Sequence, residues 1–109
     1  MITSEERARQ AIKFLATTDE QAATAKAYLQ ELEKKEKTII GLQILESKAK
    51  TNPEKEAEAR NSEAYKQWQK DYHDAVYNFE LVRNKRNTEA LIIEIWRSEN
   101  ANRRVGNVT

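Results

Sequence analysis

Hydrophobic residues recur along most of this chain at alternating spacings of three and four, the pattern of helices that carry one apolar stripe. The first stripe predicts a short helix over residues 4–16, which Thr3 and Glu6 would begin as a capping box. Thr18 belongs to a second such start signal, so we expect a break there and a second helix over residues 19–50. The apolar positions of this second helix are Ala22, Ala25, Leu29, Leu32, Ile39, Leu42, Leu45 and Ala49.

The dipeptide Asn52-Pro53 is the clearest boundary, because the residue before a proline avoids the helical conformation. The second helix should therefore end by Lys50, and Pro53 should open a third helix over residues 53–104. A connection this short favours an antiparallel helical hairpin. A polar stretch over residues 84–88 interrupts the third helix's apolar stripe and marks a candidate break. The apolar positions of that stripe are Tyr65, Trp68, Tyr72, Ala75, Phe79, Val82, Ile93 and Trp96.

The densest apolar run lies near the end of the chain, over residues 90–97. As a helix this run would be apolar over most of its circumference, so it must be covered on several sides. A second helix of the predicted length ends its coverage before this run begins. The run must therefore pack on the first helix or on another subunit. The candidate oligomerisation residues are Leu91, Ile92, Ile93, Ile95 and Trp96.

Composition supports an all-α protein with a thin core. Of 109 residues, 39% are hydrophobic and 34% charged, with only two glycines and one proline, so we expect residues 1–109 to form a single helical domain. The absence of cysteine excludes a disulfide scaffold and a thiolate zinc site, and fits a cytoplasmic location. No apolar run approaches the roughly 20 residues that span a bilayer, so no membrane association is expected.

Charge is distributed in blocks along the chain. The net charge is +1, so attraction to a polyanion must come from local patches. Residues 34–50 and 83–104 each carry a net +3, and residues 51–82 carry −3. In the hairpin the +3 block of residues 34–50 lies beside the −3 block of residues 51–82, so these two neutralise each other. The +3 block of residues 83–104 has no such partner. The candidate nucleic-acid-binding residues are Lys34, Lys35, Lys37, Arg83, Lys85, Arg86, Arg97, Arg103 and Arg104.

Three of these cations share one helical face. Arg83, Arg97 and Arg104 are separated by multiples of seven, and such a row can follow a phosphate backbone. For one protomer the simpler interpretation is a solvated face with pairs inside the helix, such as Glu94 with Arg97. Assembly through residues 90–97 would multiply the patch, and multivalency would then favour polyanion binding.

The sequence has no enzyme signature, so we expect no catalytic residue, cofactor or metal. His73 is the single histidine and lacks a second ligand at metal-binding spacing. A phosphate-binding glycine loop and a nucleophile elbow are both missing. The aromatic residues of the third-helix stripe are more typical of a core than of a base-stacking platform. Tyr28 and Tyr77 lie off the stripes and are expected to be exposed.

Three segments give the chain a resemblance to small bacteriophage recombination proteins of the UvsY-type recombination-mediator class. They are the lysine-bearing stretch 34–37, Ser62-Glu63-Ala64-Tyr65, and the apolar and basic stretch 90–98. The resemblance is one of overall plan across residues 20–104. It implies an oligomer, such as a ring, that binds single-stranded DNA in the host cytoplasm. It further implies a recombinase and a single-strand-binding protein as partners, with the oligomer loading the first and displacing the second.

Two other interpretations stay open at this point. The chain could be a small helical adaptor or inhibitor that docks on a host protein through its apolar C-terminal run. Alternatively, it could be a structural coiled-coil component of a virion or complex, with its basic face merely solvated. The adaptor predicts negligible DNA binding, and the structural component predicts assembly that is insensitive to polyanions.

Overall fold

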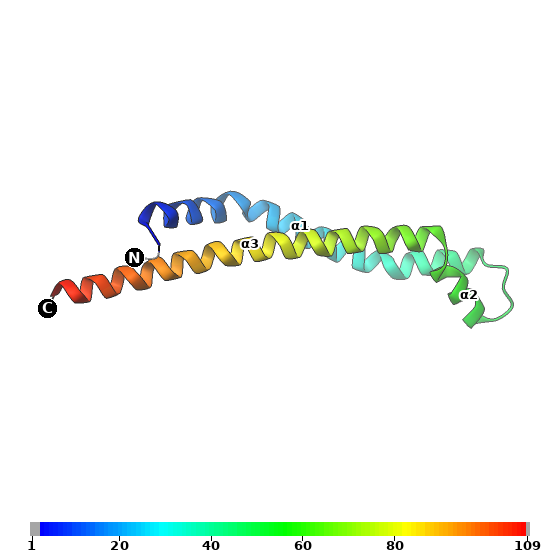
Figure 1. The fold of residues 1–109 in the computed structure, drawn as a ribbon. Coiled ribbons are helices and arrows are strands. Elements are labelled where there is room, and N and C mark those ends of the chain that lie inside the picture. Colours follow the sequence, from blue (N-terminus) through cyan, green and yellow to red (C-terminus); the bar gives the residue numbers. More distant parts are fainter. Residues whose placement is uncertain (1–2, 109) are drawn as a thin grey trace. The chain divides into compact units, whose positions relative to one another are not determined.

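The computed structural model describes residues 3–108, and every regular secondary-structure element in that range is a helix (Figure 1). Helix α1 spans Glu5–Glu46, α2 spans Asn52–Arg60 and α3 spans Glu63–Val108. Helices α1 and α3 pack against each other in opposite directions, since early residues of α1 contact late residues of α3 and later residues of α1 contact early ones. The all-α class and the helical hairpin are thus confirmed.

The predicted break near Thr18 is absent, because α1 is a single helix of 42 residues. Thr17 and Thr18 do not cap a new helix. Their hydroxyl groups donate to backbone carbonyls one turn earlier, Thr17 to Lys13 at 2.8 Å and Thr18 to Phe14 at 2.7 Å. Threonine can bond the preceding turn as well as cap the next one, and here it does the former.

A break does occur in the predicted third helix, but at its beginning instead of over residues 84–88. The hydroxyl of Ser62 donates to the carbonyl of Ala59 at 2.6 Å and accepts from the backbone N–H of Tyr65 at 3.2 Å. One side chain therefore ends α2 and begins α3. Residues 84–88 lie within the continuous α3, and α2 itself begins after Thr51, whose hydroxyl accepts from Glu54 at 3.3 Å.

The chain forms two compact units, and α1 and α3 contribute to both. The second unit, Thr24–Phe79, is built on an aromatic core. Trp68 is 8% exposed, stacks on Tyr65 and Tyr72 at ring-centroid distances of 5.4 and 5.0 Å, and donates to the carbonyl of Leu32 at 2.8 Å. The interpretation of these aromatics as core is therefore confirmed.

The first unit, Met1–Ala23 with Glu80–Thr109, has a core of small side chains. Ala8 and Ala11 of α1 are 2% and 0% exposed, and Val82 of α3 is also buried. Small residues let two helices approach closely but bury little apolar area. The N-terminal part of α1 thus covers one face of the C-terminal part of α3, which was the first of the two predicted covers for the apolar run.

Candidate nucleic-acid interface

An exposed row of arginines lies along one flank of α3. Arg83, Arg97 and Arg104 are all exposed, and their spacing in multiples of seven places them on the same side of the helix. Acidic neighbours within α3 pair with two of them: Arg83 lies 3.6 Å from Glu80, and Arg97 lies 3.0 Å from Glu94. The expected pair within the helix is therefore present, and the row is solvated and partly balanced in charge.

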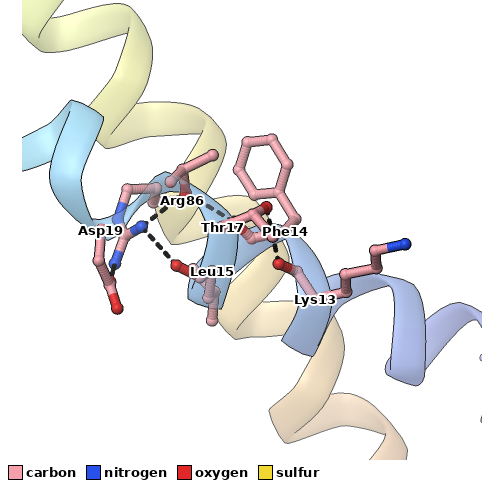
Figure 2. A network of polar contacts seen from close by, with 7 residues as sticks. Lys13, Phe14, Leu15, Thr17, Asp19 and Arg86 are labelled. Atoms are coloured by element: carbon pink, nitrogen blue, oxygen red, sulfur yellow. Dashed lines mark hydrogen bonds and ion pairs between the residues drawn. The ribbon is translucent and has the colours of Figure 1, made fainter.

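Arg86 is not part of this row. Its guanidinium donates to the backbone carbonyl of Leu15 at 2.9 Å and to the hydroxyl of Thr18 at 2.6 Å, and it pairs with Asp19 at 2.5 Å (Figure 2). The side chain is only 22% exposed, and its donors point into α1. Although the sequence placed Arg86 among the candidate nucleic-acid contacts, its hydrogen-bonding capacity serves the packing of the first unit.

A second polar contact also joins α1 to α3. Arg7 Nη2 lies 2.7 Å from Glu89 Oε1, and the Glu89 side chain is 17% exposed. The hydrogen bond from Arg7 lowers the pKa of the Glu89 carboxyl below its ordinary value, against the opposing effect of desolvation. The other oxygen, Glu89 Oε2, is buried without a hydrogen-bond partner among the residues described. Further along, the backbone N–H of Thr3 donates to Glu99 at 3.4 Å.

Lys85 and Arg103 are the remaining candidate nucleic-acid-binding residues of α3. Both are exposed, and Arg103 donates to the side-chain carbonyl of Asn100 at 2.8 Å. The predicted lysines of α1, Lys34, Lys35 and Lys37, belong to the second unit and are also exposed.

The aromatic and metal-ligating candidates of the second unit are placed as follows. Tyr28 and Tyr77 are 48% and 66% exposed, which confirms their expected exposure. His73 is exposed too. Within residues 3–108, no group of three or more histidine, aspartate or glutamate side chains could hold a metal ion.

The candidate oligomerisation segment divides between two faces of α3. Ile93 and Trp96 continue the stripe of Val82 and Glu89 that faces α1, and both are half-buried. Leu91 is 60% exposed and lies on the opposite side of the helix. Ile92 and Ile95 are half-buried between these two faces. The run therefore supplies residues both to the first unit and to the outer surface.

The contacts that sequence reasoning missed are those of Arg7 and Glu89. Their signal was present in the heptad pattern, because Arg86 and Glu89 fall on the apolar stripe of α3 where aliphatic side chains would be expected. A polar residue on such a stripe requires a partner on the facing helix. Arg7 and the Thr18 hydroxyl are those partners.

No family model matches the sequence, and comparison with curated proteins and with solved structures likewise gives no match. The helices were also compared with the requirements of a membrane span. In the part of the chain that the structure describes, none is both long and apolar enough to cross a bilayer.

Proposed function

We propose that this protein is a non-enzymatic, single-stranded DNA-binding accessory of recombination that acts as an oligomer. The observation that carries the proposal is the exposed arginine row of α3, formed by Arg83, Arg97 and Arg104. Guanidinium groups bind phosphate oxygens through paired N–H donors, and contacts of this kind do not depend on base sequence. A row of guanidinium groups along one side of a helix can contact successive phosphates of an extended nucleic-acid backbone.

The pairing of the row with acidic neighbours does not oppose this proposal. The pairs of Arg83 with Glu80 and Arg97 with Glu94 are exposed contacts between residues three apart on one helix. Such pairs contribute only about 0.3–0.5 kcal/mol. A polyanion that offers several phosphates at once can therefore displace them at little cost.

The lysines of α1 support single-stranded DNA over duplex as the ligand. Tyr28 and Lys35 are seven residues apart, so they lie on the same side of α1, and both are exposed. An exposed aromatic ring and an exposed cation on one side of a helix can stack an unpaired base and hold a phosphate of the same strand. Lys35 pairs with Glu31 at 3.5 Å, again an exposed contact within one helix.

The mediator role is the finer part of the proposal and comes from the resemblance to UvsY-type proteins. On this role the partners are a recombinase, which the oligomer loads, and a single-strand-binding protein, which it displaces. Both activities require the protein to hold single-stranded DNA first, so DNA affinity is the property to test.

The experiment is a titration of a fluorescent single-stranded oligonucleotide, followed by anisotropy at several salt concentrations. The test variant replaces the row with Arg83→Gln, Arg97→Gln and Arg104→Gln. The control replaces three exposed lysines elsewhere, Lys13, Lys26 and Lys70, also by glutamine. Both variants lose the same charge and keep good helix formers.

Wild-type binding should weaken steeply with salt, because each phosphate contact contributes about 0.7 to the logarithmic slope for a single strand. The row variant should lose about two from that slope, and the control should lose much less. Equal losses in the two variants would contradict a dedicated row, and an absence of wild-type binding at low salt would remove the proposed function.

A second candidate function, a protein-docking adaptor, is favoured by two exposed leucines on α1. Leu42 is 54% exposed and Leu45 is 83% exposed, although both are among the apolar positions predicted for the helix over residues 19–50. Exposed apolar side chains one turn apart are typical of a contact surface. The same titration separates the candidates, because the adaptor predicts no DNA binding at any salt concentration.

A further inference from the structure

Helix α3 carries two stripes of regularly spaced residues in the first unit, and only one of them is covered. The covered stripe runs through Val82, Arg86, Glu89, Ile93 and Trp96 and faces α1. The second stripe, which we call the outer stripe, also advances by alternating steps of three and four, the spacing of a coiled-coil seam. It consists of Leu81, Asn84, Thr88, Leu91, Ile95, Ser98, Asn102 and Val105.

The outer stripe collects exposed apolar side chains in a line. Leu81, Leu91 and Val105 are 39%, 60% and 68% exposed, and Ile95 is half-buried. Single exposed apolar residues are ordinary on a protein surface, but here four apolar residues share one stripe of coiled-coil spacing with Asn84, Thr88, Ser98 and Asn102 between them. A helix with this spacing needs a second helix opposite it.

The order of residues along the outer stripe reads almost the same in both directions. Reversing the stripe against itself places leucine opposite valine, asparagine opposite asparagine, threonine opposite serine and leucine opposite isoleucine. A parallel pairing brings identical positions together for any sequence, so a match in that orientation carries no information. The reversed match is a property of this sequence. Its four layers are Leu81 with Val105, Asn84 with Asn102, Thr88 with Ser98, and Leu91 with Ile95.

We propose that the outer stripe of α3 pairs in the antiparallel direction with the outer stripe of a second copy of this chain, in the register of these four layers. The two apolar layers exclude water at the centre and the ends. The Asn84–Asn102 layer, which occurs twice in the two-fold pair, favours this register, because buried asparagines in a coiled coil disfavour registers that leave them unmatched.

Residues beside the outer stripe agree with this orientation. In the antiparallel register Lys85 of each copy lies opposite Glu99 of the other, and Ile92 meets its own counterpart near the two-fold axis. A parallel pair would instead bring Glu94 of one copy near Glu99 of the other, twice, and like charges there are unfavourable. The antiparallel pair brings together only the two copies of Glu94, each of which Arg97 already neutralises at 3.0 Å.

This inference rests on the proposed function in one respect, since both require assembly through the C-terminal part of α3. It refines that assembly by assigning Leu91 and Ile95 to the contact between copies and Ile93 and Trp96 to the contact with α1. Its test contains no DNA, so the two proposals can fail separately. A reversible dimer that does not bind DNA would remove only the proposed function.

Cysteine crosslinking tests the orientation directly, because the chain has no cysteine of its own. Two single variants are prepared, Thr88→Cys and Ser98→Cys, one with an affinity tag, and both positions are exposed. Under mild oxidation the mixture should give the mixed disulfide, and each variant alone should give little, because a disulfide needs Cβ atoms about 4 Å apart. Crosslinking of each variant with itself at the rate of the mixture would overturn the antiparallel register.

Sedimentation velocity tests the surface itself. The substitution Leu91→Glu should weaken self-association by roughly tenfold or more, because an unpaired carboxylate would be buried between the copies. The matched control Ile12→Glu alters an apolar side chain of α1 that is 53% exposed and should leave self-association unchanged. Circular dichroism verifies that both variants stay helical. A wild-type chain that is monomeric at every concentration, or equal effects of the two substitutions, would overturn the proposal.

Discussion

The two units of this hairpin hold the same pair of helices together by different means. In the second unit a stacked row of aromatic rings fills the space between α1 and α3, with Trp68 at its centre. In the first unit the buried residues are mainly small, Ala8 and Ala11 among them. Charged side chains cross from one helix to the other there, from Arg86 and from Arg7.

The difference shows how a thin helical pair can be specified without a large core. Burial of a large ring supplies apolar area, roughly 25 cal/mol for each Å² removed from water. Small side chains such as Ala8 and Ala11 of α1 supply little apolar area, so hydrogen bonds between the helices must fix their register. Each such bond contributes little net stability, but a buried donor or acceptor that loses its partner is costly. The second unit should therefore respond most to loss of volume, and the first unit to loss of a polar partner.

The largest effect is expected from Trp68→Ala in the second unit. The substitution removes the central ring of the stack and leaves the Leu32 carbonyl without its donor. We expect the free energy of unfolding to fall by about 3–5 kcal/mol, as for other buried tryptophans. Urea denaturation followed by circular dichroism measures it. The control Tyr77→Ala removes an exposed ring and should cost less than about 1 kcal/mol.

A smaller effect is expected from Arg86→Met, which keeps the length of the side chain but removes its donors. The Leu15 carbonyl and the Asp19 carboxylate lose their partner, so we expect a cost of about 1–3 kcal/mol. Amide hydrogen exchange should show the loss in the first unit. The matched variant Arg83→Met, on the exposed flank, should cost about 0.5 kcal/mol or less. Equal costs would mean that the contact with α1 contributes nothing beyond an ordinary surface pair.

A weaker, pH-dependent effect should come from Glu89. Its pKa in the folded chain is lowered by the hydrogen bond from Arg7. The stabilisation is therefore complete above the unfolded-state pKa of about 4.3 and is lost as the pH falls through the lower folded-state value. Between neutral pH and about pH 3, the melting temperature of the wild type should fall more steeply with pH than that of Glu89→Gln. Identical pH profiles would show that the pair with Arg7 does not stabilise the first unit.

The smallest effect is expected from Leu45→Gln. Leu45 is 83% exposed, so little apolar area is lost on substitution. The free energy of unfolding should change by less than about 0.5 kcal/mol in either direction. Leu32 belongs to the same predicted apolar stripe of α1 but is buried, so it supplies the comparison. We expect Leu32→Ala to lower the free energy of unfolding by about 2–5 kcal/mol. A large effect at Leu45 would mean that this end of α1 is covered in solution.

Much of the candidate site follows from heptad spacing alone. The shared flank of Arg83, Arg97 and Arg104 and the pair of Arg97 with Glu94 depend on one helix only, and both are as predicted. The role of Arg86 does not follow in this way. Its position on the covered stripe was visible in the sequence, but its partners lie about 70 residues earlier in the chain.

The helix boundaries illustrate the same limit. Thr18 has the spacing of a capping box, yet its hydroxyl donates to the preceding turn and accepts from Arg86 of α3. Ser62 lacks the spacing of a capping box, because Tyr65 follows three residues later, yet its hydroxyl ends one helix and begins the next. Local signals of capping are short and ambiguous, so the contacts of the facing helix select between the alternatives.

The sequence by itself determined that this protein is all-α, that its two long helices form a hairpin, and which residues make up its apolar stripes. These properties follow from periodicity and composition, which act within single helices. Only the tertiary structure decided that α1 is continuous, that Arg86 contacts α1, and that Leu91 is left more exposed than Ile93. The physical reason is that an apolar stripe indicates only that some surface must bury it. Which distant segment does so depends on how the folded chain packs.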